Sequence, residues 1–150
     1  MKDMEIDLAF LADAATVDAS GKLNILGIFD RISVGELPGH HPHLSLVLRL
    51  AASMSEAGAH KMEIVLRDPE GTRMMGLNGE FQVGPGTALS GGTVRIPQVL
   101  NIERLVFPKE GRYSFDVGLD GEHHVSIPLY VHHMKGGRGA AQAGRKAAQA

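Results

Sequence analysis

Two alternating runs separated by a turn make up the stretch YSFDVGLDGEHHVSIPLYV, residues 113–131. Apolar side chains occupy every second position on each side of the turn: Tyr113, Phe115, Val117 and Leu119, then Val125, Ile127, Leu129 and Val131. This period of two is typical of a strand with one buried face, because successive side chains point to opposite faces. Asp120-Gly121 suits a tight hairpin turn, since both residues tolerate positive φ. The stretch therefore predicts an antiparallel hairpin.

The same alternation recurs along the chain. One apolar row is Leu44, Leu46, Leu48 and Leu50, with Ser45 and Arg49 turned away, and another is Met62, Ile64 and Leu66. We expect a first strand with Ile6, Leu8 and Phe10 on one face, then strands at residues 23–26, 28–34 past a bend at Gly27, 72–83 and 93–106. Turn signals rich in Gly, Pro and Asp separate these runs. The sequence predicts an all-β, two-sheet antiparallel β-sandwich of eight or nine strands, immunoglobulin-like or jelly-roll-like.

The aromatic residues are few, and most of them fall on apolar rows. Phe10, Tyr113 and Phe115 are expected in the core, whereas Tyr130 is out of phase with its neighbours and is the best candidate for an exposed ring. Proteins that bind sugars or single-stranded nucleic acids usually expose several stacking rings. One exposed ring makes a poor platform for such ligands.

The formal net charge of −2 conceals an asymmetry along the 150-residue chain. Residues 135–150 are rich in Gly, Ala and Gln and carry four cations with no acid, which leaves about −6 on residues 1–134. Binding of nucleic acid depends on clustered cations, so the acidic body is a poor candidate for it. We expect one sandwich domain over residues 1–134 and a disordered or marginally helical tail over residues 135–150. The tail residues that could contact an acidic partner are Lys135, Arg138, Arg145 and Lys146.

The chain has no cysteine, which removes disulfides, thiolate metal ligands and a cysteine nucleophile. The N-terminal residues lack the apolar run of a signal peptide, and no segment approaches the roughly 20 apolar residues that span a bilayer. These features predict a cytoplasmic protein that does not associate with a membrane.

Eight histidines are the unusual side-chain feature of the sequence. They lie in groups: His40, His41 and His43; His60; His123 and His124; His132 and His133. A transition metal requires three or four ligands that converge from rigid elements. His40, His41 and His43 are the candidates for such a site, because His41 and His43 share a face if the segment is extended. The alternative is that the histidines are polar residues at strand ends and in an exposed loop.

Signatures of catalysis are missing from the sequence. None of the serines stands in a Gly-x-Ser-x-Gly elbow, and neither glycine-rich segment has the lysine and hydroxyl of a phosphate-binding loop. We therefore predict no catalytic residues, no bound cofactor and no enzymatic activity.

Two parts of the chain resemble a known family. The opening, LADAATV at 11–17 followed by GKLNILGIFDRI at 21–32, resembles that of an uncharacterised family of small bacterial proteins. The closing pattern, FP at 107–108, Gly111, Tyr113, Phe115 and IPLYV at 127–131, is similar to the last hairpin of that family and of immunoglobulin-like sandwiches. The resemblance implies a β-sandwich domain of unknown function and supplies no catalytic residues.

Three functional hypotheses follow. The leading one is a non-enzymatic binding or assembly module whose partner is a protein, including a second copy of the chain, because a sandwich offers edge strands, sheet faces and loops. The second is a metal-binding or small-ligand-binding protein or enzyme built on the histidines. The third is binding of nucleic acid or an acidic surface through the tail.

Overall fold

A computed structural model describes residues 4–84 and 92–134. Within these residues the chain forms nine strands and one short 3₁₀ turn, η1: β1 (Glu5–Val17), β2 (Leu23–Phe29), β3 (Arg31–Val34), β4 (Gly39–Ser53), η1 (Met54–Glu56), β5 (Gly58–Arg67), β6 (Arg73–Val83), β7 (Thr93–Phe107), β8 (Gly111–Leu119) and β9 (Glu122–His133). The predicted tail, residues 135–150, lies outside the described residues. In the described part of the chain, no helix has the length and apolar character needed to cross a bilayer.

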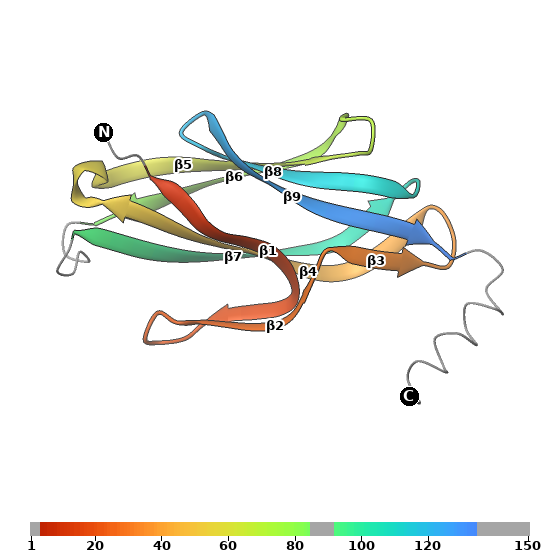
Figure 1. Cartoon of the computed structure of the whole chain (residues 1–150), viewed down its shortest axis with the longest axis horizontal. Coiled ribbons are helices and arrows are strands. Elements are labelled where there is room, and N and C mark those ends of the chain that lie inside the picture. Colours follow the sequence, from red (N-terminus) through yellow and green to blue (C-terminus); the bar gives the residue numbers. More distant parts are fainter. Residues whose placement is uncertain (1–3, 85–91, 135–150) are drawn as a thin grey trace.

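The strands form two sheets that pack face to face (Figure 1). One sheet has four strands in the order β2-β1-β4-β7, and the other has five in the order β3-β9-β8-β5-β6. The predicted all-β sandwich is confirmed, with nine strands. One pairing departs from the antiparallel prediction, because β3 runs parallel to β9.

The core lies between the sheets and consists of the alternating rows that the sequence indicates. Leu44, Leu46, Leu48 and Leu50 are fully buried, and they face residues from β5, β8 and β9 in one apolar cluster. The Asp120-Gly121 hairpin is confirmed: φ is 51° at Asp120 and 86° at Gly121, as a type I′ turn requires. Period-two patterning thus positions both layers of the sandwich.

The core face of β1 differs from the prediction. A bulge between Ile6 and Leu8 shifts the pairing of β1 with β4, so that the alternation changes phase within the strand. Ile6, Ala9 and Leu11 therefore face the core, whereas Phe10 is paired beside Val47 and packs outside the core cluster. The prediction that Phe10 is a core residue is wrong, because a strict period of two does not anticipate the extra residue of a bulge.

The break between the second and third strands also lies elsewhere than predicted. Gly27 adopts φ of 71° yet stays within β2, which continues to Phe29. The chain leaves the four-stranded sheet at Asp30, and β3 begins at Arg31 in the opposite sheet. A glycine inside a strand can accommodate a local irregularity without ending it, whereas a change of sheet leaves no signature in the alternation.

The outer face of the four-stranded sheet is more apolar than predicted. Val47 and Ser45 point away from the core leucines, yet both are fully buried. Val47 lies between Phe10 and Val99 on the neighbouring strands, and the Ser45 hydroxyl donates to Asn101 Oδ1 at 2.8 Å. Side chains from β1 and β7 thus cover the outer face of β4, and the core covers its inner face.

Candidate protein-interaction surface

The two sheets have four edge strands within the described residues, β2 and β7 in one and β3 and β6 in the other. An exposed edge offers free backbone donors and acceptors to another chain, and most proteins protect it with charges or by keeping it short. Three edges follow this rule: β3 has four residues and includes Arg31, β6 includes Arg73 and Glu80, and β7 includes Arg95 and Glu103. The fourth, β2, reads LNILGIF and has no charged residue.

The edge strand β2 also carries the most exposed large apolar side chains that the structure describes. Leu26 is 71% exposed and Ile28 is 63% exposed. Their partners on β1 are Ala14 and Ala12, whose small side chains leave them uncovered. Single exposed apolar residues are common, but two neighbours on an uncharged edge form a patch that favours contact with another molecule.

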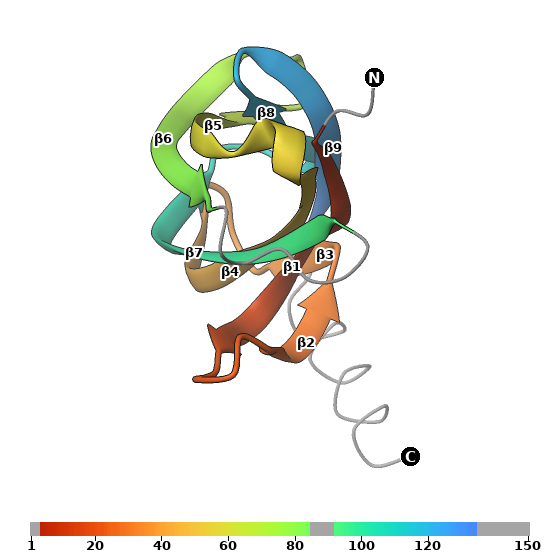
Figure 2. The same cartoon turned by 90° about the vertical axis from the view of Figure 1, so that its left-hand side faces the viewer.

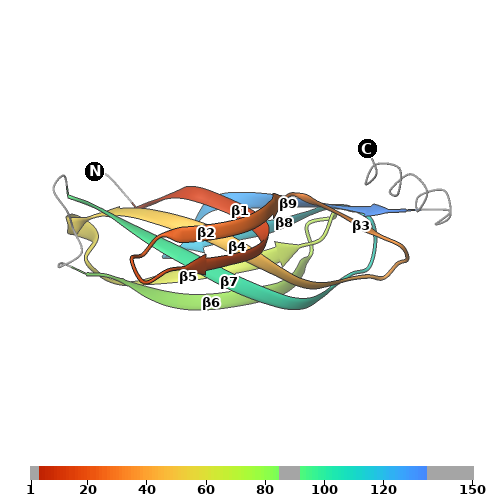
Figure 3. The ribbon, with the colours of Figure 1, turned by 90° about the horizontal axis from the view of Figure 1, so that it is seen from below.

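The β1–β2 hairpin projects from the sandwich on the side away from the five-stranded sheet (Figures 1 and 2). Phe29 at the end of β2 packs against the core cluster, but Leu23 and Ile25 do not belong to it. Figure 3, seen from below, shows β2 and its neighbour β1 running side by side on the side of the molecule nearest the viewer. The hairpin therefore presents one free backbone edge and apolar side chains to the surroundings.

A hydrogen-bonded turn closes this hairpin. Asp18 Oδ1 accepts hydrogen bonds from the backbone amides of Ser20 and Lys22 at 2.9 and 3.0 Å, and Gly21 adopts φ of 85°. These hydrogen bonds, together with those from the Ser20 and Asn24 side chains, lower the pKa of Asp18 to about 2. The Asp18 carboxylate is therefore ionised under ordinary conditions and fixes the start of β2.

The three candidate metal ligands, His40, His41 and His43, do not converge on one point. His40 is exposed, His43 Nδ1 pairs with Glu103, and His41 turns toward Phe29 with ring centroids 5.8 Å apart. Burial lowers the pKa of His41, whose Nε2 atom is buried and makes no hydrogen bond to the described residues. Across residues 4–84 and 92–134, no three His, Cys, Asp or Glu side chains gather closely enough to hold one metal ion.

His60, on β5 of the five-stranded sheet, has a structural role. Its Nδ1 lies 2.6 Å from Asp120 Oδ2 and its Nε2 lies 2.5 Å from the Glu56 carbonyl oxygen. Both ring nitrogens thus face acceptors, and this arrangement raises the pKa of His60 because the doubly protonated ring can donate to both. The ring also stacks on Phe81, so His60 links η1, β6 and the β8–β9 turn.

A Ser-His-Asp cluster on the outer face of β8 and β9 does not have the geometry of a nucleophile. Ser126 Oγ donates to Asp116 Oδ1 at 2.8 Å, and His123 Nε2 lies 2.9 Å from the same hydroxyl. In a catalytic triad the acid orients the histidine, and the histidine accepts the serine proton. Here the Ser126 hydroxyl donates its hydrogen bond to Asp116, which also accepts one from Arg67. The cluster is therefore a surface hydrogen-bond network.

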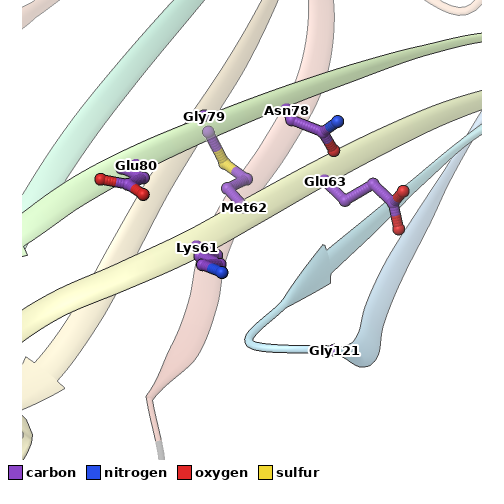
Figure 4. A pocket seen from close by; sticks show the side chains of 7 residues that line it. All are labelled: Lys61, Met62, Glu63, Asn78, Gly79, Glu80 and Gly121. Atoms are coloured by element: carbon purple, nitrogen blue, oxygen red, sulfur yellow. The ribbon is translucent and has the colours of Figure 1, made fainter.

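An open groove of about 660 Å³ lies over β5 and β6 beside the β8–β9 turn. Lys61, Glu63, Asn78 and Glu80 supply its polar lining. Figure 4 shows the carboxylates of Glu63 and Glu80 directed away from each other, so they do not converge on a common point. These two carboxylates therefore do not form a paired acidic site.

The described candidate residues His40, His41 and His43 lie on β4 and not on the exposed edge β2. Lys135, Arg138, Arg145 and Lys146 fall outside the described residues, and the histidine groups are dispersed among strand ends. Leu26 and Ile28 were not predicted as functional residues. The signal that identifies them is the segment 23–29, which is uncharged and apolar in both phases of the alternation.

Comparisons with known proteins relate the chain to a sequence family and to solved structures. A comparison with curated proteins finds no match. Among solved structures, the Pseudomonas fluorescens alkylpurine DNA glycosylase AlkC, bound to DNA containing an abasic site analog, aligns with a TM-score of 0.46 and 14% identity. The alignment covers 87% of this chain and 30% of the glycosylase. The model of the family of unknown function DUF6941 matches residues 7–132, and the chain belongs to that family.

Proposed function

We propose that the chain is a non-enzymatic protein-binding module that captures a β-strand of its partner at the edge of β2. The observation that carries the proposal is the contrast among the four edges: β2 alone among them combines an uncharged sequence with two highly exposed aliphatic side chains. In this mode of recognition, main-chain hydrogen bonds supply affinity and alternate side chains supply specificity.

The outer sheet face extends the surface next to β2. Ile28 and Leu26 adjoin Ala12 and Ala14 on β1, and Phe10 continues the apolar row toward β4. A strand added to β2 would cover Leu26 and Ile28. Burying a fully exposed aliphatic side chain contributes roughly 1.5–3 kcal/mol, and these two, at 71% and 63% exposure, would contribute less than that each. Ordering two partners offsets much of this gain, so the backbone hydrogen bonds of the added strand are needed for stable binding.

Photo-crosslinking from the edge tests the proposal. A photoreactive phenylalanine analogue replaces Asn24, which lies on β2 beside Leu26, in protein expressed in its native host. The matched control places the analogue at Val106, which is 42% exposed on the charged edge strand β7. We expect discrete adducts from Asn24 that disappear when Leu26→Lys is added, since a lysine on the edge disfavours strand pairing. Adducts no more abundant from Asn24 than from Val106 would overturn the proposal.

A further inference from the structure

We infer that the strand captured at β2 is β2 of a second copy of the chain, paired antiparallel about a two-fold axis that passes beside Leu26. The inference rests on the proposed function and names its partner. Two copies joined in this way share one continuous eight-stranded sheet, in which the two β2 strands lie at the centre. An antiparallel pair of identical edges satisfies a closed two-fold assembly, because each strand presents the same surface to the other.

The order of side chains along β2 suits this register. With Leu26 opposite Leu26 of the partner subunit, Leu23 falls opposite Phe29 of the partner subunit, and Asn24 falls opposite Ile28 of the partner subunit. Residues directly opposite in an antiparallel pair point to the same face, so Leu26 also lies diagonally beside the partner's Ile28. The exposed aliphatic side chains of both copies therefore meet on the outer face of the joined sheet.

Charges at the two ends of β2 select the register. Lys22 precedes the strand and Asp30 follows it, each four residues from Leu26. In the antiparallel pair each Lys22, just before the strand, comes to the same end as Asp30 of the partner subunit, just after it, and the axis generates this proximity twice. A register displaced by two residues in either direction separates both pairs. No charge lies within Leu23–Phe29, so no like charges oppose each other along the edge.

The cysteine-free sequence allows a direct test of the geometry. In Leu26→Cys the only two thiols of the dimer lie opposite each other at the axis, where paired Cα atoms are about 4.5–5.5 Å apart and within disulfide range. In the control Asn24→Cys the two thiols are offset by four positions, about 13 Å. We expect mild oxidation to convert Leu26→Cys to a disulfide dimer and to leave Asn24→Cys monomeric. Mixing Asn24→Cys with Ile28→Cys should give the mixed dimer.

Exchanging the charges of Lys22 and Asp30 tests the register independently of the disulfide experiment. Dimerisation of each variant, without any disulfide, is measured by sedimentation across a range of protein concentrations. Lys22→Asp and Asp30→Lys should each weaken dimerisation by roughly 3- to 30-fold, since two partly exposed ion pairs become repulsive. The double variant should recover dimerisation close to that of the wild type. Leu26→Lys should be monomeric, whereas Val106→Lys, the matched change on β7, should dimerise normally. Circular dichroism verifies that each variant is folded.

The outcomes separate this inference from the proposed function. A wild-type mass equal to the monomer up to about 1 mM, the weakest range of specific association, overturns the second copy as partner. Failure of the charge exchange to restore dimerisation, or oxidation of Asn24→Cys in preference to Leu26→Cys, overturns the register. If the protein is monomeric while Asn24 still crosslinks to a chain of another mass, the proposed function stands with a different partner. If the protein neither dimerises nor gives specific crosslinks from Asn24, both the inferred dimer and the proposed function are overturned.

Discussion

Two hairpins of this protein close with the same turn but follow different courses afterward. In β1–β2 and in β5–β6, an aspartate, Asp18 or Asp68, accepts hydrogen bonds from the backbone amides two and four residues later, and a glycine three residues later has φ of 85°. After the turn, β6 buries Phe81 and Val83 and carries charges at its edge. The corresponding strand β2 exposes Leu26 and Ile28 and carries no charge.

Turn chemistry therefore closes a hairpin but does not determine its role. The sequence of the second strand determines whether the hairpin completes the core or remains available to a partner. If that view is right, changes in β5–β6 alter the stability of the whole domain, and changes in the outer part of β1–β2 alter association and local motion.

The largest expected contrast is between Leu66→Ala and Leu26→Ala. Leu66 on β5 is 1% exposed, so removing its side chain leaves a cavity and lowers the free energy of unfolding by about 2–5 kcal/mol. Leu26 is 71% exposed, and its truncation should change stability by no more than about 0.5 kcal/mol in dilute protein. Urea unfolding at low protein concentration measures both. Equal losses would show that β2 belongs to the core.

The two turn glycines offer a matched pair of smaller size. Alanine at Gly71 or Gly21 would meet no neighbouring atom, so the strain is that of a left-handed backbone, roughly 1–2 kcal/mol. Gly71→Ala should lower global stability by that amount. Gly21→Ala should have a smaller effect on global unfolding and should instead speed hydrogen exchange of the β2 amides. A loss of global stability that is the same in both variants would contradict a locally unfolding β1–β2 hairpin.

His60 should add a pH-dependent contribution to the β5–β6 side of the comparison. Its folded pKa is raised by hydrogen bonds to Asp120 and Glu56, so its stabilisation is fully present below the unfolded pKa of about 6.5 and is lost as pH rises through the folded value. The difference in unfolding free energy between wild type and His60→Gln should therefore be larger at pH 6 than at pH 8.5, by up to about 1 kcal/mol. A difference that is independent of pH would remove His60 from this role.

The contribution of His41, beside Phe29, to the free energy of unfolding should depend on pH in the opposite direction, and it should be the smallest of these effects. Burial lowers its folded pKa, so stability declines as pH falls below the unfolded value of about 6.5 toward the folded one. His41→Leu should abolish this decline, which we expect to be about 0.5 kcal/mol or less because the ring is only partly buried. Parallel denaturation series of wild type and variant at pH 5.5 and 7.5 measure it. A decline of equal size in the variant would assign it to other groups.

Much of the fold could be predicted because alternation reports directly on burial. The rows at Leu44 and at Tyr113 face the core as predicted, and the Asp120-Gly121 turn adopts the dihedral angles that its residues favour. The bulge at Ile6–Leu8 and the parallel pairing of β3 with β9 could not be predicted, since they depend on strand partners distant in sequence. Burial of Val47 similarly requires Phe10 and Val99 on neighbouring strands.

The candidate surface was harder to predict than the fold. The segment 23–29 contains apolar residues in both phases, which is equally typical of a strand buried on two faces. Only its position at the end of a sheet distinguishes an interaction edge from a buried strand, and sheet order is a property of the whole chain. The histidine groups, which are conspicuous in the sequence, are dispersed by the same topology.

Hydrogen exchange of the wild-type protein at increasing concentration, followed strand by strand, tests the unprotected edge most directly. We expect amides within Leu23–Phe29 to exchange rapidly in dilute protein and to become protected as concentration rises, whereas those of the charged edge strand β6 remain unchanged. Protection of β2 that does not depend on concentration, or concentration-dependent protection confined to β6, would contradict it.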